Sequence, residues 1–249
     1  MADAKAVSEK VQAYKNDLIK KAENLIVIEF PQKIVKLNEL LETSRFAKDK
    51  NMKCVKQDLN IPVPDPILLC DGDGNSCEPP AKRTRVATDT VTGTKVMALP
   101  NGLVKCNTFI TDLIEIVKPI IQELVEDSNV LKMWISFLIP KVEDGNNFGV
   151  SIQEDTLAEI QSVESEAAAF FDQISRYFIS RAKVVSKVAK YPHIADYRRA
   201  VQELDEKEFL SLWLVTSEVR NRYCSLHDIV IKNMEKLKKP RSSNAESLY

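Results

Sequence analysis

Few residues in this chain have the type and spacing that catalysis requires. Its two histidines, His193 and His227, each stand alone among residues with helical periodicity. No cluster of Cys, Asp or Glu gives them metal-ligand spacing, so we interpret both as structural residues. The acidic residues Asp205, Glu206 and Glu208 are interpreted as solvated charges on a helix face. The chain also lacks a glycine-rich phosphate-binding loop and a nucleophile elbow.

One acidic motif resembles the first half of a calcium-binding loop. Asp71, Asp73 and Asn75 occupy alternate positions, as the first calcium ligands do in an EF-hand. Ser76 stands where that loop needs a glycine, and Lys82 stands where it needs a glutamate. The motif therefore fails as a calcium site. We expect no metal, no cofactor and no catalytic residues, so the protein is interpreted as non-catalytic.

The composition of the chain limits its possible fold classes and its cellular location. The chain has 249 residues, 44% hydrophobic and 29% charged, with a net charge of -1 and only six glycines. So little glycine argues against turn-rich β folds and Rossmann folds. The N-terminus, Met1–Lys5, has no apolar signal region, and no apolar run is long enough to span a membrane. The five cysteines are scattered and are interpreted as reduced thiols: Cys54, Cys70, Cys77, Cys106 and Cys224.

The most unusual stretch is a short polar segment that contains the only two glycines after residue 103. It consists of Glu143, Asp144, Gly145, Asn146, Asn147, Phe148 and Gly149. Gly and Asn tolerate positive φ, so the segment is predicted to make a tight, non-helical turn. Two interpretations are open: a helix connection with Phe148 packed beneath it, or a shaped loop that contacts a partner.

Hydrophobic periodicity predicts long helices on both sides of this loop. The predicted organisation is one domain with a helix at 4–43, a flexible insert at 44–100 and three more helices within 101–249. Those three helices are expected at 103–139, 151–190 and 194–238. Long helices with short turns pack antiparallel, so the fold class is all-α, a four-helix bundle.

Prolines refine these boundaries. Pro31 is expected to kink or break the first helix after Phe30, and Pro119 is expected to kink the second. Pro140 and Pro240 are expected to mark the ends of the second and fourth helices. Within the insert, every second residue of 61–66 is a proline, so this stretch is predicted to be extended. A short ordered stretch is predicted at 66–69.

Some residues fall outside a single apolar seam. Val184, Leu214 and Val230 add apolar surface to the helices, which indicates either burial between subunits or ordinary exposed residues. Glu164 and Arg181 interrupt an apolar stripe and are interpreted as polar or partner-facing positions.

The insert also carries a short basic run. Lys82, Arg83 and Arg85 follow two prolines and could be recognised by nuclear import machinery. A patch this small neutralises few phosphates, so direct binding to nucleic acid is not expected.

Several of these stretches, in this order, resemble the 11S (REG) family of proteasome activators. They are Ile61–Ile67, Leu138–Glu154, Lys190–His193, Asp196–Arg198 and Lys236–Arg241. The basic insert and the tail, residues 242–249, resemble the gamma branch of that family, which is nuclear and homomeric. Thr84 departs from the family by interrupting a longer basic run.

The resemblance implies a homoheptameric ring that binds the α-subunit end of the 20S proteasome without ATP. It implies that a C-terminal tail, 241–249, docks between α subunits. From this tail and the two residues before it, the residues assigned to docking are Lys239, Pro240, Leu248 and Tyr249. The resemblance further implies that the loop at 143–149 opens the proteasome gate for peptides and some unstructured proteins. The expected location is the nucleus, with the cytoplasm also open, and no membrane partner is expected.

Two other classes of protein stay open from the residues alone. One is a structural helical-bundle scaffold, for which the loop and the tail would be incidental. The other is a nuclear adaptor that acts through the basic insert.

Overall fold

The computed structural model describes residues 2–65, 99, 101–143, 145 and 147–241. Every regular element in these residues is helical. The elements are α1 (Ala2–Asn24), the π-helical turn η1 (Leu25–Glu29), α2 (Phe30–Glu42), α3 (Lys48–Val55), α4 (Thr108–Leu138), α5 (Phe148–Lys190) and α6 (Ala195–Lys238). No helix among the described residues is long and apolar enough to cross a membrane.

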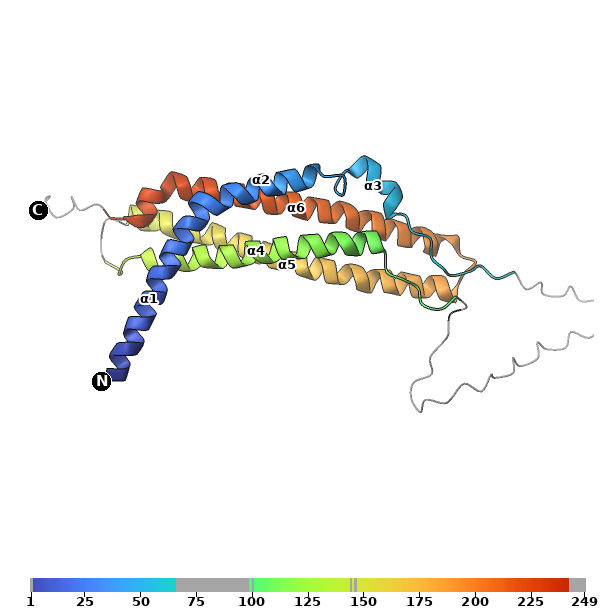
Figure 1. The fold of residues 1–249 in the computed structure, drawn as a ribbon, viewed down its shortest axis with the longest axis horizontal. Helices are drawn as coiled ribbons and strands as arrows, with labels where there is room; N and C mark the ends of the chain where they lie inside the picture. The colour runs from blue at the N-terminus through green and yellow to red at the C-terminus, as the bar shows by residue number, and fades with distance from the viewer. Residues whose placement is uncertain (1, 66–98, 100, 144, 146, 242–249) are drawn as a thin grey trace, which may run out of the picture.

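Four long elements lie side by side and confirm the predicted bundle. In Figure 1, α2, α4, α5 and α6 run along the long axis, each antiparallel to the one before it. With 43 residues, α5 spans roughly 65 Å at about 1.5 Å per residue. The largest fully buried side chains include Trp134, Tyr223, Phe30 and Phe209, which belong to one continuous core.

The first predicted helix is interrupted at Leu25–Glu29, which lies before Phe30 and not after it. Pro31 has no N–H to donate, and its ring would crowd the carbonyl four residues earlier. The chain accommodates this with the wider π turn η1, in which the Phe30 N–H donates to the Leu25 carbonyl. Beyond this turn α1 leaves the bundle at an angle, and its N-terminal half projects away from the other helices (Figure 1).

The helix α4 begins later than its apolar pattern predicts. Asn107 precedes its first turn in an extended conformation, and its side-chain Oδ1 accepts from the N–H of Ile110 at 3.3 Å. This contact satisfies one of the free donors of the first turn and ends the preceding extended segment. Pro119 lies inside α4, which continues past it to Leu138.

Part of the predicted insert is ordered. Residues 44–65 include the helix α3, which the proline content of the region did not predict. Asn51 Nδ2 stabilises the turn that precedes α3 by donating to the Ser44 and Arg45 carbonyls at 2.6 and 2.8 Å. Phe46 and Val55 are both buried in the main core. The prediction of a flexible insert at 44–100 is therefore wrong for this folded part, and most of the remaining insert lies outside the described residues.

After α3 the chain has no regular structure as far as residue 65. Its attachment to the bundle is specific, because Ile61 is buried and Arg198 donates to the Ile61 carbonyl at 2.7 Å. This confirms that the proline-rich stretch is not helical. The predicted ordered stretch at 66–69 lies outside the described residues.

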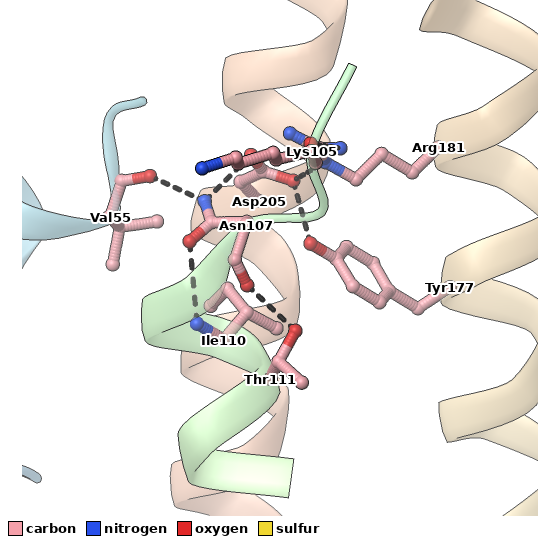
Figure 2. Close-up of polar contacts among 8 residues, drawn as sticks. All are labelled: Val55, Lys105, Asn107, Ile110, Thr111, Tyr177, Arg181 and Asp205. Carbon is pink, nitrogen blue, oxygen red and sulfur yellow. Dashed lines mark hydrogen bonds and ion pairs between the residues drawn. The ribbon is translucent and has the colours of Figure 1, made fainter. Parts of the chain in front are cut away.

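A buried aspartate holds together the end of the bundle where this segment joins it. Asp205 is 1% exposed, so its prediction as a solvated charge is wrong. Its Oδ1 accepts from Arg181 Nε and from the Tyr177 hydroxyl, both at 2.8 Å (Figure 2). Its Oδ2 accepts from Asn107 Nδ2 at 2.8 Å. The carboxylate therefore joins α5 and α6 to the start of α4.

The same network reaches the end of α3. Asn107 Nδ2 also donates to the Val55 carbonyl at 2.8 Å, so one amide ties the segments that flank the insert to each other and to Asp205 (Figure 2). Arg181 is thus an internal residue and not a partner-facing one. Glu164 is half-buried, and it pairs with Lys132 Nζ of α4 at 2.6 Å.

The neighbouring acidic residues of α6, Glu206 and Glu208, are not freely solvated either. Glu206 pairs with Lys56 at 3.3 Å. Glu208 is 7% exposed, and burial raises its pKa to about 7, while the nearby Lys207 acts in the opposite direction. The sequence interpretation failed for Glu206 because its partner Lys56 lies far away in the chain, and for Glu208 because its burial depends on how the helices pack.

The raised pKa of Glu208 predicts a pH-dependent stability. The protonated carboxyl is favoured in the folded chain, so the free energy of unfolding should fall as pH rises from the ordinary 4.5 through about 7. Glu208→Gln, which mimics the protonated form, should raise stability by up to about 3 kcal/mol at pH 8 and have little effect near pH 5. Thermal unfolding across this range measures the difference. The exposed Glu203→Gln is the matched control, and a gain of the same size at both pH values would contradict the prediction.

Candidate functional site at the loop end of the bundle

Three helix ends meet where the 143–149 segment lies. There α4 ends at Leu138, α5 begins at Phe148, and α6 ends at Lys238. Gln153 of α5 is fully buried between them, and its Nε2 donates to the Leu138 carbonyl at 3.1 Å and to the Leu237 carbonyl at 2.7 Å. One side-chain amide therefore satisfies a free C-terminal carbonyl of two helices and fixes their relative position.

The start of α5 is in close backbone contact with Pro240, two residues past the end of α6. Gly149 is buried, and a Cβ built on it would lie 2.0 Å from the Pro240 carbonyl oxygen and 2.6 Å from its carbonyl carbon. Both atoms belong to the backbone and cannot move aside alone. The contact requires glycine at position 149, and it confirms that the loop and the C-terminal end of α6 share one end of the bundle.

Arg241 makes the longest-range polar contacts of the site. Its Nη1 donates to Glu143 Oε2 at 2.8 Å, and its Nη2 donates to the Lys141 carbonyl at 3.0 Å. A longer contact of 3.4 Å joins Nη2 to Asn147 Oδ1. A residue at the root of the tail thus holds both sides of the loop.

One glycine of the loop has a backbone conformation that would be strained for any other residue. Gly145 has φ of +83°, and nothing lies within 4 Å of a Cβ built on it. Its role is therefore conformational, unlike that of Gly149. Asn147 ends the loop, and its Nδ2 lies 3.4 Å from the Glu143 carbonyl. The predicted loop residues Asp144 and Asn146 lie outside the described residues.

Two apolar side chains are exposed at this end. Val142 is fully exposed, and Phe148, in the first turn of α5, is 74% exposed. The interpretation that Phe148 packs beneath the loop is therefore wrong, because the helix starts early enough to direct this residue outward. Exposed apolar residues beside a held loop favour the alternative, a surface that contacts a partner.

The remaining predicted site residues are only partly described. In the root of the tail, Lys239 is exposed and Pro240 is partly buried against Gly149. The tail residues Leu248 and Tyr249 and the basic residues Lys82, Arg83 and Arg85 lie outside the described residues. No group of three or more His, Cys, Asp or Glu in the described part of the chain could hold a metal ion.

Sequence reasoning missed two residues of this site. Gln153 stands within the apolar-patterned start of a helix, and Arg241 directly follows a helix-ending proline. Only the second carries a local signal, since a basic residue near a helix C-terminus complements the helix dipole. Nothing local indicates that Gln153 reaches two other helices.

The family to which this chain belongs is visible in its sequence. A model of the N-terminal part of proteasome activator PA28 matches residues 5–66, and a model of its C-terminal part matches residues 103–247. The human protein described as proteasome activator complex subunit 3 is 50% identical over 242 residues, covering 96% of this chain and 95% of that protein. Its chicken relative matches to the same extent. The chain belongs to the PA28 family of proteasome activators.

Solved structures agree with the fold. The 11S subunit PA28 of the Plasmodium falciparum proteasome is 29% identical, with a TM-score of 0.74, and the match covers 96% of this chain and 93% of that one. An activator, P26, crystallised with an archaeal 20S proteasome has a TM-score of 0.62 over 99% of both chains. At 13% identity that second likeness shows the shared fold alone.

The close approach at Gly149 yields a prediction. In Gly149→Ala the new methyl group would overlap the Pro240 carbonyl, so the start of α5 and the root of the tail should separate, at a cost of roughly 1–3 kcal/mol. Hydrogen exchange should accelerate both at 139–152 and at 235–241. Gly145→Ala is the matched control, because it strains the loop backbone without any contact to Pro240. Unchanged exchange at 235–241 in the Gly149 variant would show that this contact does not hold the two segments together.

Proposed function

We propose that this protein is an ATP-independent activator of the 20S proteasome that does no bond chemistry itself. The observation that carries the proposal is the joining of the 143–149 loop to the root of the tail at one end of a rigid bundle. Membership of the PA28 family supplies the partner class. The tail docks on the α-subunit ring, and the loop, carried at a fixed position, opens the gate to peptides and some unstructured proteins.

The proposal includes assembly into a homoheptameric ring. Support comes from α1, whose N-terminal half projects away from the other helices (Figure 1) and carries a stripe of exposed apolar residues. Val7, Val11 and Tyr14 are 59%, 50% and 61% exposed, whereas Leu18, farther along the same face, is buried in the core. A stripe that continues the core outward favours burial against a second copy. A ring multiplies the tails, which can raise avidity by about 10²–10⁴ over a single tail.

A nuclear location is the third part of the proposal. It rests on the resemblance to the gamma branch and on the basic run Lys82, Arg83 and Arg85. The alternatives, a scaffold or an adaptor, explain neither the held loop nor the exposed Val142 and Phe148 beside it.

Assembly is tested on the α1 stripe. Replacing Val7, Val11 and Tyr14 with Asp should reduce the particle to monomers or small oligomers, because charges on this face resist burial. Native mass spectrometry at low micromolar concentration reports the size against the 28.2 kDa monomer. The matched control places Asp on another face of α1, at the exposed residues Ser8, Gln12 and Asn16. An unmodified protein that is monomeric would overturn the ring, and an intact ring in the stripe variant would overturn the role of α1.

Docking and activation are tested separately. Removal of Leu248 and Tyr249 should abolish co-sedimentation with latent 20S proteasome and stimulation of peptide hydrolysis together. Asn146→Tyr should spoil the shape of the loop and leave every tail intact. That variant should assemble, co-sediment and compete with the unmodified protein, yet fail to stimulate hydrolysis. The division of labour is wrong if the loop variant loses binding as completely as the truncation, or keeps full activity.

Localisation is tested in cells. Replacing Lys82, Arg83 and Arg85 with Ala should reduce nuclear accumulation of a fluorescently tagged protein, because the import machinery recognises basic side chains. Equal nuclear accumulation of both forms would place the signal elsewhere, for instance in 236–241.

A further inference from the structure

The contacts of Arg241 join the tail to both sides of the loop. Its acceptors are the Lys141 carbonyl and the Glu143 carboxylate before the loop turns, and Asn147 after it. The planar guanidinium holds such acceptors at fixed mutual positions, which a lysine ammonium cannot do. The Arg241 side chain is 22% exposed, so these contacts are partly shielded from water.

The described part of the loop has little else to fix its shape. Among its described residues, Asn147 Nδ2 donates to the Glu143 carbonyl over a long distance of 3.4 Å. Gly145 has open space around it and allows the backbone many conformations. Exposed ion pairs contribute little, but here one charged group makes several hydrogen bonds, which is the stronger arrangement. The charge also lies beyond the C-terminal ends of α4 and α6, where the helix dipoles favour a cation.

We infer that Arg241 is a positioning residue for gate opening, which couples the root of the docking tail to the conformation of the loop between α4 and α5. This inference rests on the proposed function. The residue that begins the tail is the one that holds the loop, so the loop reaches its partner at a set distance from the docked tail. Without the guanidinium the tail still docks, but the loop samples other conformations and presses on the gate less often.

The test uses the full-length protein with three changes: Arg241→Gln, Glu143→Ala and both together. Each variant should keep the oligomer size and the unfolding temperature. Each should co-sediment with latent 20S proteasome as the unmodified protein does. The peptide hydrolysis rate at saturating activator should fall roughly three- to tenfold, the range expected when a charged hydrogen-bond clamp is removed.

The double variant separates coupling from independent effects. If Glu143 acts through Arg241, the double variant should stimulate hydrolysis at least as well as the less active of the two single variants. If Glu143 instead contacts the proteasome directly, the two losses should multiply. Arg241→Lys should recover only part of the activity, because it keeps the charge without the fork. Arg220→Gln on α6, which removes an exposed guanidinium bonded to Asn38, is the matched control and should stay fully active.

A second readout does not depend on the proteasome. Hydrogen exchange of the isolated activator at 141–147 should accelerate in Arg241→Gln and not in Arg220→Gln. If Arg241→Gln shows unchanged exchange and full activity while the unmodified protein stimulates hydrolysis, the inference fails and the proposed function stands. If Arg241→Gln loses co-sedimentation as the tail truncation does, Arg241 is a docking residue and the inference is overturned. If the unmodified protein neither binds nor stimulates the proteasome, the proposed function fails and the coupling fails with it.

Discussion

The backbone contact between Gly149 and Pro240 is the constraint on which the loop end of this protein depends. It sets the first turn of α5 against the backbone two residues past the end of α6, with no side chain between them. Gln153, one turn farther into α5, then donates to the last carbonyls of α4 and α6. Together these contacts fix three helix ends, so the loop between α4 and α5 has little freedom in where it begins and ends. The position of the loop thus follows from packing and not from its own sequence.

The opposite end of the bundle uses a different device. Asp205 is a buried charge, which costs free energy unless it is paired and fully hydrogen-bonded. Here Arg181, Tyr177 and Asn107 supply the donors, and Asn107 extends the network to the backbone beside α3 (Figure 2). The arrangement holds the two segments that flank the insert at a fixed separation. A long insertion is tolerated because its ends are already in place, so its length affects the bundle little.

Sequence patterns were informative where the physical cause is local. Apolar periodicity predicted the long helices, and the glycine pair located the loop, because both depend on neighbours in the chain. Patterns failed where the cause is distant. Asp205 and Glu208 have the composition of a solvated helix face, yet they are buried, and the partners of Asp205 lie 24 to 98 residues away.

The predicted helix boundaries were wrong for the same reason. Phe148 belongs to a helix that begins at the loop, and α3 depends on a core that Phe46 and Val55 enter from an otherwise proline-rich segment. Gln153 carries no local signal for the contacts that it makes. Its two acceptors, the carbonyls of Leu138 and Leu237, lie 15 residues before it and 84 residues after it in the chain.

The contrast between the loop and the tail follows from what each must contribute in the proposed function. A tail that docks in a pocket can find it by diffusion, so its affinity depends on its side chains and on the number of copies present. A loop that acts by pressing on a gate has no such freedom, because a displaced loop presses in the wrong place. Ordering a loop on binding also costs roughly 1–2 kcal/mol per residue. Holding it beforehand, with backbone contact at Gly149 and polar contacts at its flanks, removes that cost from the binding step. The exposed Val142 and Phe148 are then carried on a frame that is already rigid.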